Sequence, residues 1–355
     1  MKPSSPGVIL PIQYLRGIAA LMVAWHHGVN QLPGLEAYFP LRFGTSGVDL
    51  FFVISGFIMV MTTVGKYITP MSFMARRAIR VVPLYWVLTF ALVAVILVAP
   101  SVFRTTLLMP ASLAQSLLFI PHLSPSHAGM IWPVLVPGWT LNYEMFFYAM
   151  FAASLAFRHR LAVLAATLVA LVAAGYVLGP FSNPIARTYT DPILLEFVAG
   201  AVIGHLWVGS RINLPMLAAA ASVLCGAALL VLRDAAPLAN YTQLLGAILV
   251  VVGSLNLSRL EWQCSALRLL GDASYSIYLT HIFTLGAWRW VWAKMGLDAS
   301  NLPWAALFMT MALVACAVVG WLAFRWVEAP LLDGLNSRLR TKPRGRESTT
   351  TRPTA

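Results

Sequence analysis

Arg16 and His27 lie eleven positions apart in QYLRGIAALMVAWHH (13–27), a spacing that places both on one side of a helix. At about 100° per residue the two side chains fall within roughly 20° of each other, three turns and about 16 Å apart. His26 points about 80° away, so His27 is the candidate. A neutral imidazole takes a proton from a hydroxyl, and we expect His27 to be a general base. Anchoring at the membrane surface is the ordinary alternative for Arg16.

Carboxylates supply partners for this imidazole. Asp49 lies in GTSGVDLFFVISGFIM, Glu144 in GWTLNYEMFFY, and Asp191 and Glu196 begin a later apolar segment. In the span arrangement given below, all four enter from the outer side and gather at the depth of His27. Because a carboxylate orients an imidazole and stabilises its cation, we predict Asp49 and Glu144 as catalytic partners. No two ligands form an i, i+4 pair, and we expect no metal.

A second histidine, His281, lies in GDASYSIYLTHIF, where Ser274, Tyr278 and His281 share one helical face. This face is either a hydrogen-bonding patch between helices or a direct contact with substrate. We predict that Tyr278 and His281 contact the substrate, together with Asn142 of GWTLNYEMFFY.

Two arginines three residues apart, Arg77 and Arg80, precede an apolar segment in ARRAIRVVPLYW. Neighbouring guanidinium groups on a helix can clamp phosphates, although positive residues at an inner helix end also serve topology alone. Together these features indicate a phosphate site inside, a general base higher up, and a polar passage between them. Gly200 and Gly204 in GAVIG predict a helix-packing surface.

The elements that position these residues must be membrane helices. Of the 355 residues 59% are hydrophobic and 10% charged, and the mean hydropathy is +0.78. A water-soluble core cannot hide that much apolar surface, so the chain is a polytopic membrane protein embedded in a lipid bilayer. The net charge of +12 lies in short runs between apolar segments, which favours membrane orientation over nucleic-acid binding. The three cysteines have no paired spacing.

We expect an all-α bundle of about ten transmembrane helices in the inner (cytoplasmic) membrane. An even number of spans puts both termini on one side. If that side is the cytoplasm, 18 of the 24 Lys and Arg lie at or beyond cytoplasmic helix ends, as the positive-inside rule requires. The first span should be retained in the mature protein. The predicted spans are 13–30, 47–63, 83–99, 138–157, 161–178, 191–208, 214–232, 241–257, 273–293 and 304–326.

Two segments fall outside this pattern. The stretch 100–137 is rich in proline and holds a short apolar piece, 111–120, which predicts a surface or re-entrant element. The polar C-terminal run is typical of a disordered cytoplasmic tail. We therefore divide the chain into a transmembrane domain, 1–335, and a basic tail, 336–355.

Seven segments in order make the sequence resemble the acyltransferase 3 family of membrane-bound acyltransferases, in particular its exopolysaccharide (succinoglycan-type) O-acetyltransferases. They are QYLRGIAALMVAWHH, GVDLFFVISGFIM, RRAIRVVPLYW, GWTLNYEMFFY, LLEFVAGAVIG, GDASYSIYLTH and FRWVEAP. The resemblance implies that Arg16 and His27 form the family's Arg–His motif, that Arg77 and Arg80 form its RxxR motif, and that Glu144 is its acid in the fourth span.

The resemblance implies O-acetylation with cytoplasmic acetyl-CoA as co-substrate and a glycan or lipid-linked sugar as acceptor. Polysaccharide-synthesis machinery is an expected partner. Arg77, Arg80 and Arg16 would hold the phosphates of acetyl-CoA, while the pantetheine reaches His27. A covalent acyl-histidine is the competing chemistry. Another acyl donor, such as succinyl-CoA, and an antibiotic acceptor stay open.

Two other classes of protein remain alternatives. A transporter of a glycan or small molecule would also place polar residues inside a ten-helix bundle. A structural scaffold gives no reason for His27, Glu144 and Asp49 to converge. We expect Trp132 and Trp139 to be interfacial anchors, with stacking on a sugar ring as the alternative.

Overall fold

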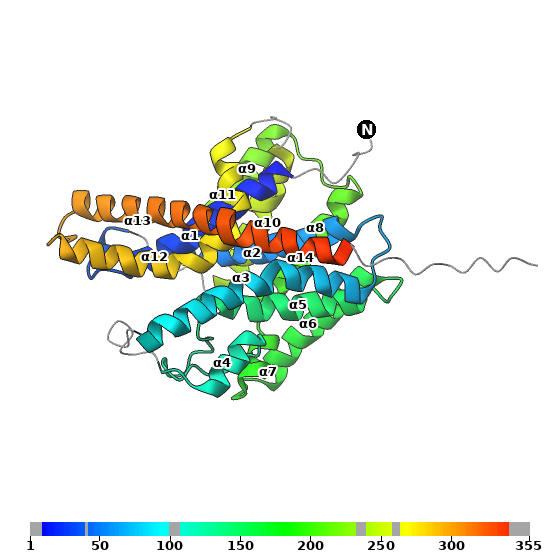
Figure 1. Ribbon diagram of the computed structural model, residues 1–355. Helices are drawn as coiled ribbons and strands as arrows, with labels where there is room; N and C mark the ends of the chain where they lie inside the picture. The colour runs from blue at the N-terminus through cyan, green and yellow to red at the C-terminus, as the bar shows by residue number, and fades with distance from the viewer. Residues whose placement is uncertain (1–8, 40–41, 99–106, 232–238, 258–262, 341–355) are drawn as a thin grey trace, which may run out of the picture.

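The computed structural model describes residues 9–39, 42–98, 107–231, 239–257 and 263–340. Within these ranges helices are joined by loops, and there is no strand (Figure 1). Ten helices overlap the ten predicted spans. They are α1 (Leu10–Val29), α2 (Ser46–Thr63), α3 (Pro70–Val98), α5 (Trp139–Ser154), α6 (Arg160–Leu178), α8 (Leu194–Val208), α9 (Met216–Val231), α10 (Ala239–Leu257), α12 (Ser274–Lys294) and α13 (Leu302–Ala323).

Five segments are long and apolar enough to cross a membrane: Phe43–Thr63, Pro70–Val98, Arg160–Leu178, Pro184–Val208 and Leu302–Ser337. Helix α9 and the stretch Tyr241–Leu257 of α10 are apolar but shorter. Helices α1 and α12, with 20 and 21 residues, are long enough to cross a membrane. Their mean hydropathy is lower than that of the five segments, because they carry polar side chains that include Arg16, His27 and His281. Two of the helices that carry predicted site residues are therefore less apolar than an ordinary membrane span.

Helix α3 corrects one predicted boundary. The predicted third span begins at Pro83, whereas the helix begins at Pro70 and continues through that proline. Proline lacks the N–H that would bond one turn back, but a helix tolerates this loss where neighbouring groups compensate. Arg77 and Arg80 consequently lie inside the helix, on a rigid element, rather than in a segment before it.

Helix α1 lies within the bundle and packs against α2, α11 (Ser265–Asp272), α12 and α13. At its start, Gln13 Nε2 donates to Asp272 Oδ1 at 2.5 Å. Beyond its end, the Tyr38 hydroxyl donates to the carbonyl of Ser300, in the connection between α12 and α13, at 2.9 Å. The two ends of α1 thus meet the corresponding ends of α12, as alternating spans require.

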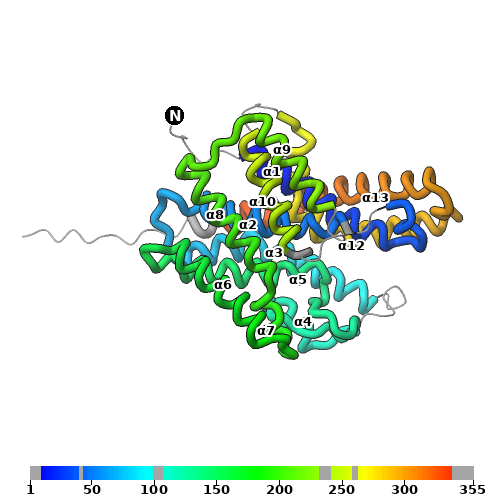
Figure 2. Tube along the Cα trace, turned by 180° about the vertical axis from the view of Figure 1, so that it is seen from behind, coloured from blue at the N-terminus to red at the C-terminus, as the bar shows by residue number. Residues whose placement is uncertain are grey.

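Helices α2 and α8 cross closely because both carry glycine at the contact. A Cβ added to Gly200 would lie 1.9 Å from the carbonyl oxygen of Val53, and one added to Gly56 would lie 2.1 Å from that of Phe197. The predicted packing surface on α8 is confirmed. Seen from behind, α6 and α8 cross the face turned to the viewer (Figure 2).

Short elements complete the fold: η1 (Leu35–Ala37), η2 (Arg42–Thr45), α4 (Pro110–Leu117), η3 (Val136–Gly138) and α7 (Pro184–Tyr189). Helix α4 overlaps most of the predicted apolar piece 111–120. After α13 the chain continues through a π-helical turn, η6 (Phe324–Glu328), into α14 (Ala329–Arg340). The helix passes the proposed domain boundary at 336, and most of the predicted tail, 341–355, lies outside the described residues.

Candidate functional site

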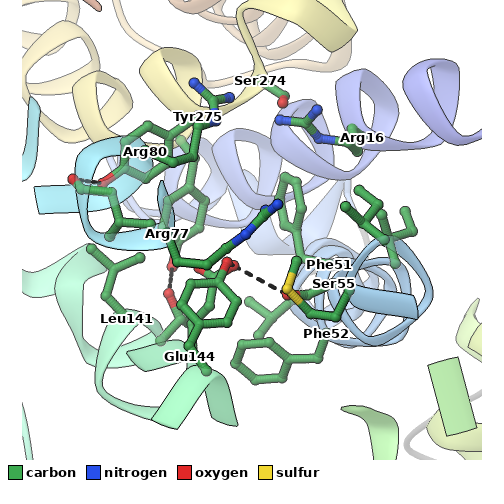
Figure 3. Close-up of a pocket in the computed structure, with 18 residues that line it drawn as sticks. Arg16, Phe51, Phe52, Ser55, Arg77, Arg80, Leu141, Glu144, Ser274 and Tyr275 are labelled. Carbon is green, nitrogen blue, oxygen red and sulfur yellow. Dashed lines mark hydrogen bonds between the residues drawn. The ribbon is translucent and has the colours of Figure 1, made fainter. Parts of the chain in front are cut away.

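Two cavities inside the bundle hold most of the predicted site residues. The first, which we call the arginine cavity, has a volume of about 150 Å³. Its guanidinium groups gather at one side and Glu144 lies at the other (Figure 3). Its polar lining comes from α1, α2, α3, α5 and α12: Arg16, Ser55, Arg77, Arg80, Thr140, Glu144, Tyr148, Ser274, Tyr275 and Tyr278.

Arg80 already forms an ion pair with a carboxylate of the same chain, that of Glu328. Its Nη1 donates to Glu328 Oε1, and Ser276 Oγ donates to the other carboxylate oxygen at 2.5 Å. Glu328 is only 1% exposed, and it sits at the end of the π-helical turn η6. The Arg80 guanidinium also lies 5.6 Å from the ring of Tyr275. Such a network holds Arg80 in one position and neutralises its charge.

Arg16 and Arg77, in contrast, form no ion pair within the described part of the chain. Arg77 lies over the rings of Phe73 and Tyr148, at 5.7 and 6.0 Å, and its buried Nε has no hydrogen-bond partner there. Arg16 Nη1 donates to Gln13 Oε1 at a long 3.3 Å. Two guanidinium groups therefore face the cavity with donors to spare, the arrangement that a phosphate or carboxylate needs.

Glu144 does not meet His27, which corrects the sequence-based pairing. Its carboxylate accepts hydrogen bonds from Tyr148 and from Ser55, and it lines the arginine cavity. Glu144 and Asp49 both lie near the helix ends that are predicted to be on the outer side. The rotation of α5 about its axis nevertheless turns Glu144 toward α2 and α3. Depth along a helix follows from sequence, whereas the direction in which a face points depends on packing.

The second cavity, which we call the histidine cavity, has a volume of about 480 Å³. His27 and Asp49 both line it, as predicted, and so do Asp191 and Glu196. Its other polar and aromatic lining residues are His26, Thr45, Trp132, Trp139, Tyr143, Tyr241, Gln243, Tyr278 and His281. The structure thus brings His27 together in one chamber with Asp49 and two of the other three acids named from the sequence.

His27 and His281 lie side by side, with ring centroids 4.9 Å apart and planes inclined by 31°. His281 is fully buried, and its Nδ1 lies 2.6 Å from the carbonyl oxygen of Tyr278. A carbonyl only accepts, so Nδ1 carries the proton and Nε2 of the neutral ring is a bare acceptor. Within the described residues this Nε2 has no hydrogen-bond partner. His281 is thus ready to accept a hydrogen bond from a hydroxyl.

Asn142, predicted to contact substrate, lines neither cavity and is 3% exposed. Thr140 and Glu144 of the same helix face the arginine cavity, and a residue two positions from each points about 200° away. The helical period therefore turns Asn142 into the packed side of α5.

Tyr278 and Val48 line both cavities and form the wall between them. The Tyr278 hydroxyl donates to the carbonyl of Pro137 at 3.0 Å and lies 2.8 Å from Thr140 Oγ1. These contacts join α12 to the start of α5. Helix α1 runs past both cavities, with Arg16 lining the arginine cavity and His27 lining the histidine cavity.

Comparison with known proteins identifies the class of protein that this arrangement serves. A family model described as "Acyltransferase domain" matches residues 10–322, nearly all of the helical bundle. The chain belongs to the acyltransferase 3 family. It is therefore a membrane acyltransferase, and family membership decides against the transporter and the scaffold. Both cavities lie within the matched residues.

Two curated relatives share this bundle. "Exopolysaccharide production protein ExoZ" of Rhizobium meliloti (strain 1021) is 42% identical over 295 residues, which cover 81% of this chain and 90% of that protein. "Putative membrane-bound transacylase BcsY" of Komagataeibacter xylinus is 29% identical over 305 residues, covering 76% and 71%. No solved structure matches the chain significantly.

Sequence reasoning missed Glu328 as a site residue. The signal was present, because FRWVEAP places a carboxylate at the end of an apolar span. An ionisable group at such a depth is costly unless it is paired, so this carboxylate indicates a cationic partner elsewhere in the bundle. Its partner, Arg80, lies 248 positions away in sequence, so no local pattern indicates it.

Proposed function

We propose that this membrane acyltransferase transfers an acetyl group from acetyl-CoA to a hydroxyl of an exopolysaccharide or a lipid-linked sugar. The observation that carries the proposal is the division of the polar interior into two adjoining cavities. One holds two arginines that form no ion pair among the described residues, and the other holds two neighbouring histidines. The name of the relative ExoZ supports exopolysaccharide as the process. We place the enzyme in the cytoplasmic membrane with both termini in the cytoplasm.

Acetyl-CoA would bind with its phosphates against Arg16 and Arg77. Arg80 supports this site rather than contacting the phosphates itself, because Glu328 already holds its guanidinium. The pantetheine arm would then extend past Tyr278, so that the thioester reaches the histidine cavity. The flexible arm carries no charge, and it suits a path between Tyr278 and Val48.

In the histidine cavity, His27 would remove the proton from the acceptor hydroxyl as the oxygen attacks the thioester carbonyl. The C–O bond forms, the C–S bond breaks, and the imidazolium returns its proton to the departing thiolate. Asp49, in the same cavity, would stabilise the imidazolium. Formation of an acyl-histidine before the sugar enters is the competing order of events.

The test is acceptor-dependent release of CoA by purified protein in lipid, comparing wild type with His27→Ala. His159→Ala is the control, because His159 is exposed at the start of α6 and lines neither cavity. We expect the His27 variant to lose transfer by about 100-fold or more while the control is unchanged. Equal rates for all three proteins would remove His27 from the mechanism.

A further inference from the structure

Glu144 lies on a face of α5 that follows the length of the arginine cavity. Thr140, Glu144 and Tyr148 all line this cavity, and successive turns of the helix place them over about 12 Å in two equal steps. At one end, the Arg77 guanidinium lies 6.0 Å from the ring of Tyr148. At the other end, Thr140 Oγ1 lies 2.8 Å from the hydroxyl of Tyr278, in the wall between the two cavities. Glu144 is therefore midway between an arginine that faces the cavity and the wall.

The Glu144 carboxylate is held through one oxygen only. Ser55 Oγ donates to Oε1 at 3.2 Å, and the Tyr148 hydroxyl donates to the same oxygen. Among the residues that the structure describes, no hydrogen bond ends on Oε2. The side chain is thus fixed in place, while Oε2 can accept a charge-assisted hydrogen bond from a ligand in the cavity.

Helix α3 runs beside α5 in the opposite direction and gives a scale of depth. Arg77 contacts Tyr148, and Tyr85, eight residues after Arg77, lies against the start of α5. One turn beyond Arg77, α3 therefore reaches Val81 at the depth of Glu144.

Ser274 lies at this same depth on α12, on the side of the cavity opposite Glu144 (Figure 3). The hydroxyl of the adjacent residue, Tyr275, donates to the carbonyl of Val81 at 2.7 Å, which fixes the depth. Ser274 is fully buried, and its Oγ has no hydrogen-bond partner among the described residues. Because a buried hydroxyl without a partner is costly, it indicates that a ligand group belongs at this point.

The two side chains match the two edges of a secondary amide. A trans amide presents its N–H on one edge and its carbonyl on the opposite edge. A carboxylate oxygen accepts and a serine hydroxyl can donate, so an amide between Glu144 and Ser274 can bond on both edges. The pantetheine arm of CoA carries two such amides between its phosphates and its sulfur. Glu144 and Ser274 lie at the corresponding place on the path from Arg77 to the wall.

We propose that Glu144 and Ser274 bind one amide of the pantetheine arm: Glu144 Oε2 accepts from its N–H, and Ser274 Oγ donates to its carbonyl. The inference rests on the proposed function, in which acetyl-CoA enters the arginine cavity. It gives Glu144, which the sequence assigned to His27, a different role. Glu144 and Ser274 position the arm, so that the thioester beyond it reaches the histidine cavity.

The experiment measures equilibrium binding to purified protein in lipid nanodiscs, without an acyl group or an acceptor. The ligands are CoA, the adenosine bisphosphate that lacks the arm, and two CoA analogues in which an ester oxygen replaces one or the other amide N–H. We expect one of the two esters to bind at least about tenfold more weakly than CoA, because it loses a hydrogen bond to a charged group.

Glu144→Gln keeps one oxygen for the two hydroxyl donors and turns the free acceptor into an NH2 group. In this variant the same ester should bind at most about threefold more weakly than CoA, since the N–H no longer has its acceptor. Ser274→Ala should weaken the binding of CoA about threefold or more. Both variants should bind adenosine bisphosphate at least as tightly as wild type does, whereas Arg77→Gln should weaken both ligands. Glu36→Gln, an exposed change in η1, is the control and should bind every ligand as wild type does.

Equal binding of CoA and both esters by wild type would overturn the amide site, as would an undiminished ester penalty in Glu144→Gln. If Ser274→Ala weakened adenosine bisphosphate and CoA alike, Ser274 would be a phosphate ligand and its place in this site would be wrong. Unfolding temperatures confirm that each variant is folded, and the ester comparison in wild type needs no variant.

The outcomes separate this inference from the proposed function. An ester penalty without acetyl transfer contradicts the transfer alone, and acetyl transfer without an ester penalty contradicts this inference alone. Failure of wild type to bind CoA would contradict both.

Discussion

Replacing Arg77 by glutamine tests whether the arginine cavity binds the phosphates of the acyl donor. The change removes one of two guanidinium groups that face the cavity without an ion-pair partner among the described residues, and it keeps a side chain of polar character. A hydrogen bond between charged groups contributes about 1.5–3 kcal/mol. The apparent KM for acetyl-CoA should therefore rise about 10- to 150-fold. The kcat should fall much less, since the proposed general base, His27, lines the other cavity.

The neighbouring arginine provides the matched control. Arg76 is exposed on the same turn of α3, so Arg76→Gln removes the same charge from the same end of the same helix. If these arginines serve membrane topology alone, the two variants behave alike. The assay is the initial rate of CoA release in lipid nanodiscs across a range of acetyl-CoA concentrations. An Arg77 variant whose KM matches that of the Arg76 variant would refute the phosphate site.

Three further predictions concern packing, charge and chemistry. Gly200→Ala should lower stability by about 1–3 kcal/mol, because the added Cβ meets the backbone of α2. Gly286→Ala, where the added Cβ lies in open space on α12, should not lower stability. Thermal unfolding in detergent compares the two variants. Glu328→Ala should lower the free energy of unfolding by about 2 kcal/mol in the same assay. This is less than the ~3–5 kcal/mol for breaking a fully buried ion pair, because Arg80 is 29% exposed. Asp333→Ala, at an exposed position, should leave stability unchanged. With acetyl-CoA and no acceptor, mass spectrometry should find no acetylated histidine, and a trapped acyl-enzyme would contradict direct transfer.

Hydropathy predicted the helices well because each apolar segment must satisfy its own backbone in lipid, whatever its neighbours do. The same rule does not set how a helix is rotated. Glu144 and Asp49 enter at similar depth, yet only Asp49 reaches the cavity of His27. The helical period separates Asn142 from Glu144, but which of the two faces a cavity follows from packing against α2 and α3.

The start of the third span was predicted wrongly for a related physical cause. Pro83 marks a helix boundary in a soluble chain, while in this bundle α3 passes through it and carries Arg77 and Arg80 on one rigid element. The pairing of Arg80 with Glu328 depends on two segments at opposite ends of the chain. By contrast, the histidine and arginine of α1 were predictable, because both lie on one helix and its geometry is known in advance.

The wall made by Tyr278 and Val48 also bears on the insulation of the membrane. In the proposed orientation the two cavities approach the bilayer from opposite compartments, and a continuous wet path between them would dissipate the proton gradient of the cell. The hydroxyl of Tyr278, held by Pro137 and Thr140, closes that path with a side chain rather than with a long apolar barrier. An uncharged pantetheine can displace such a plug and fill the opening while it passes. While Tyr278 is displaced, the bound acyl donor itself would block the passage of water and protons between the two cavities.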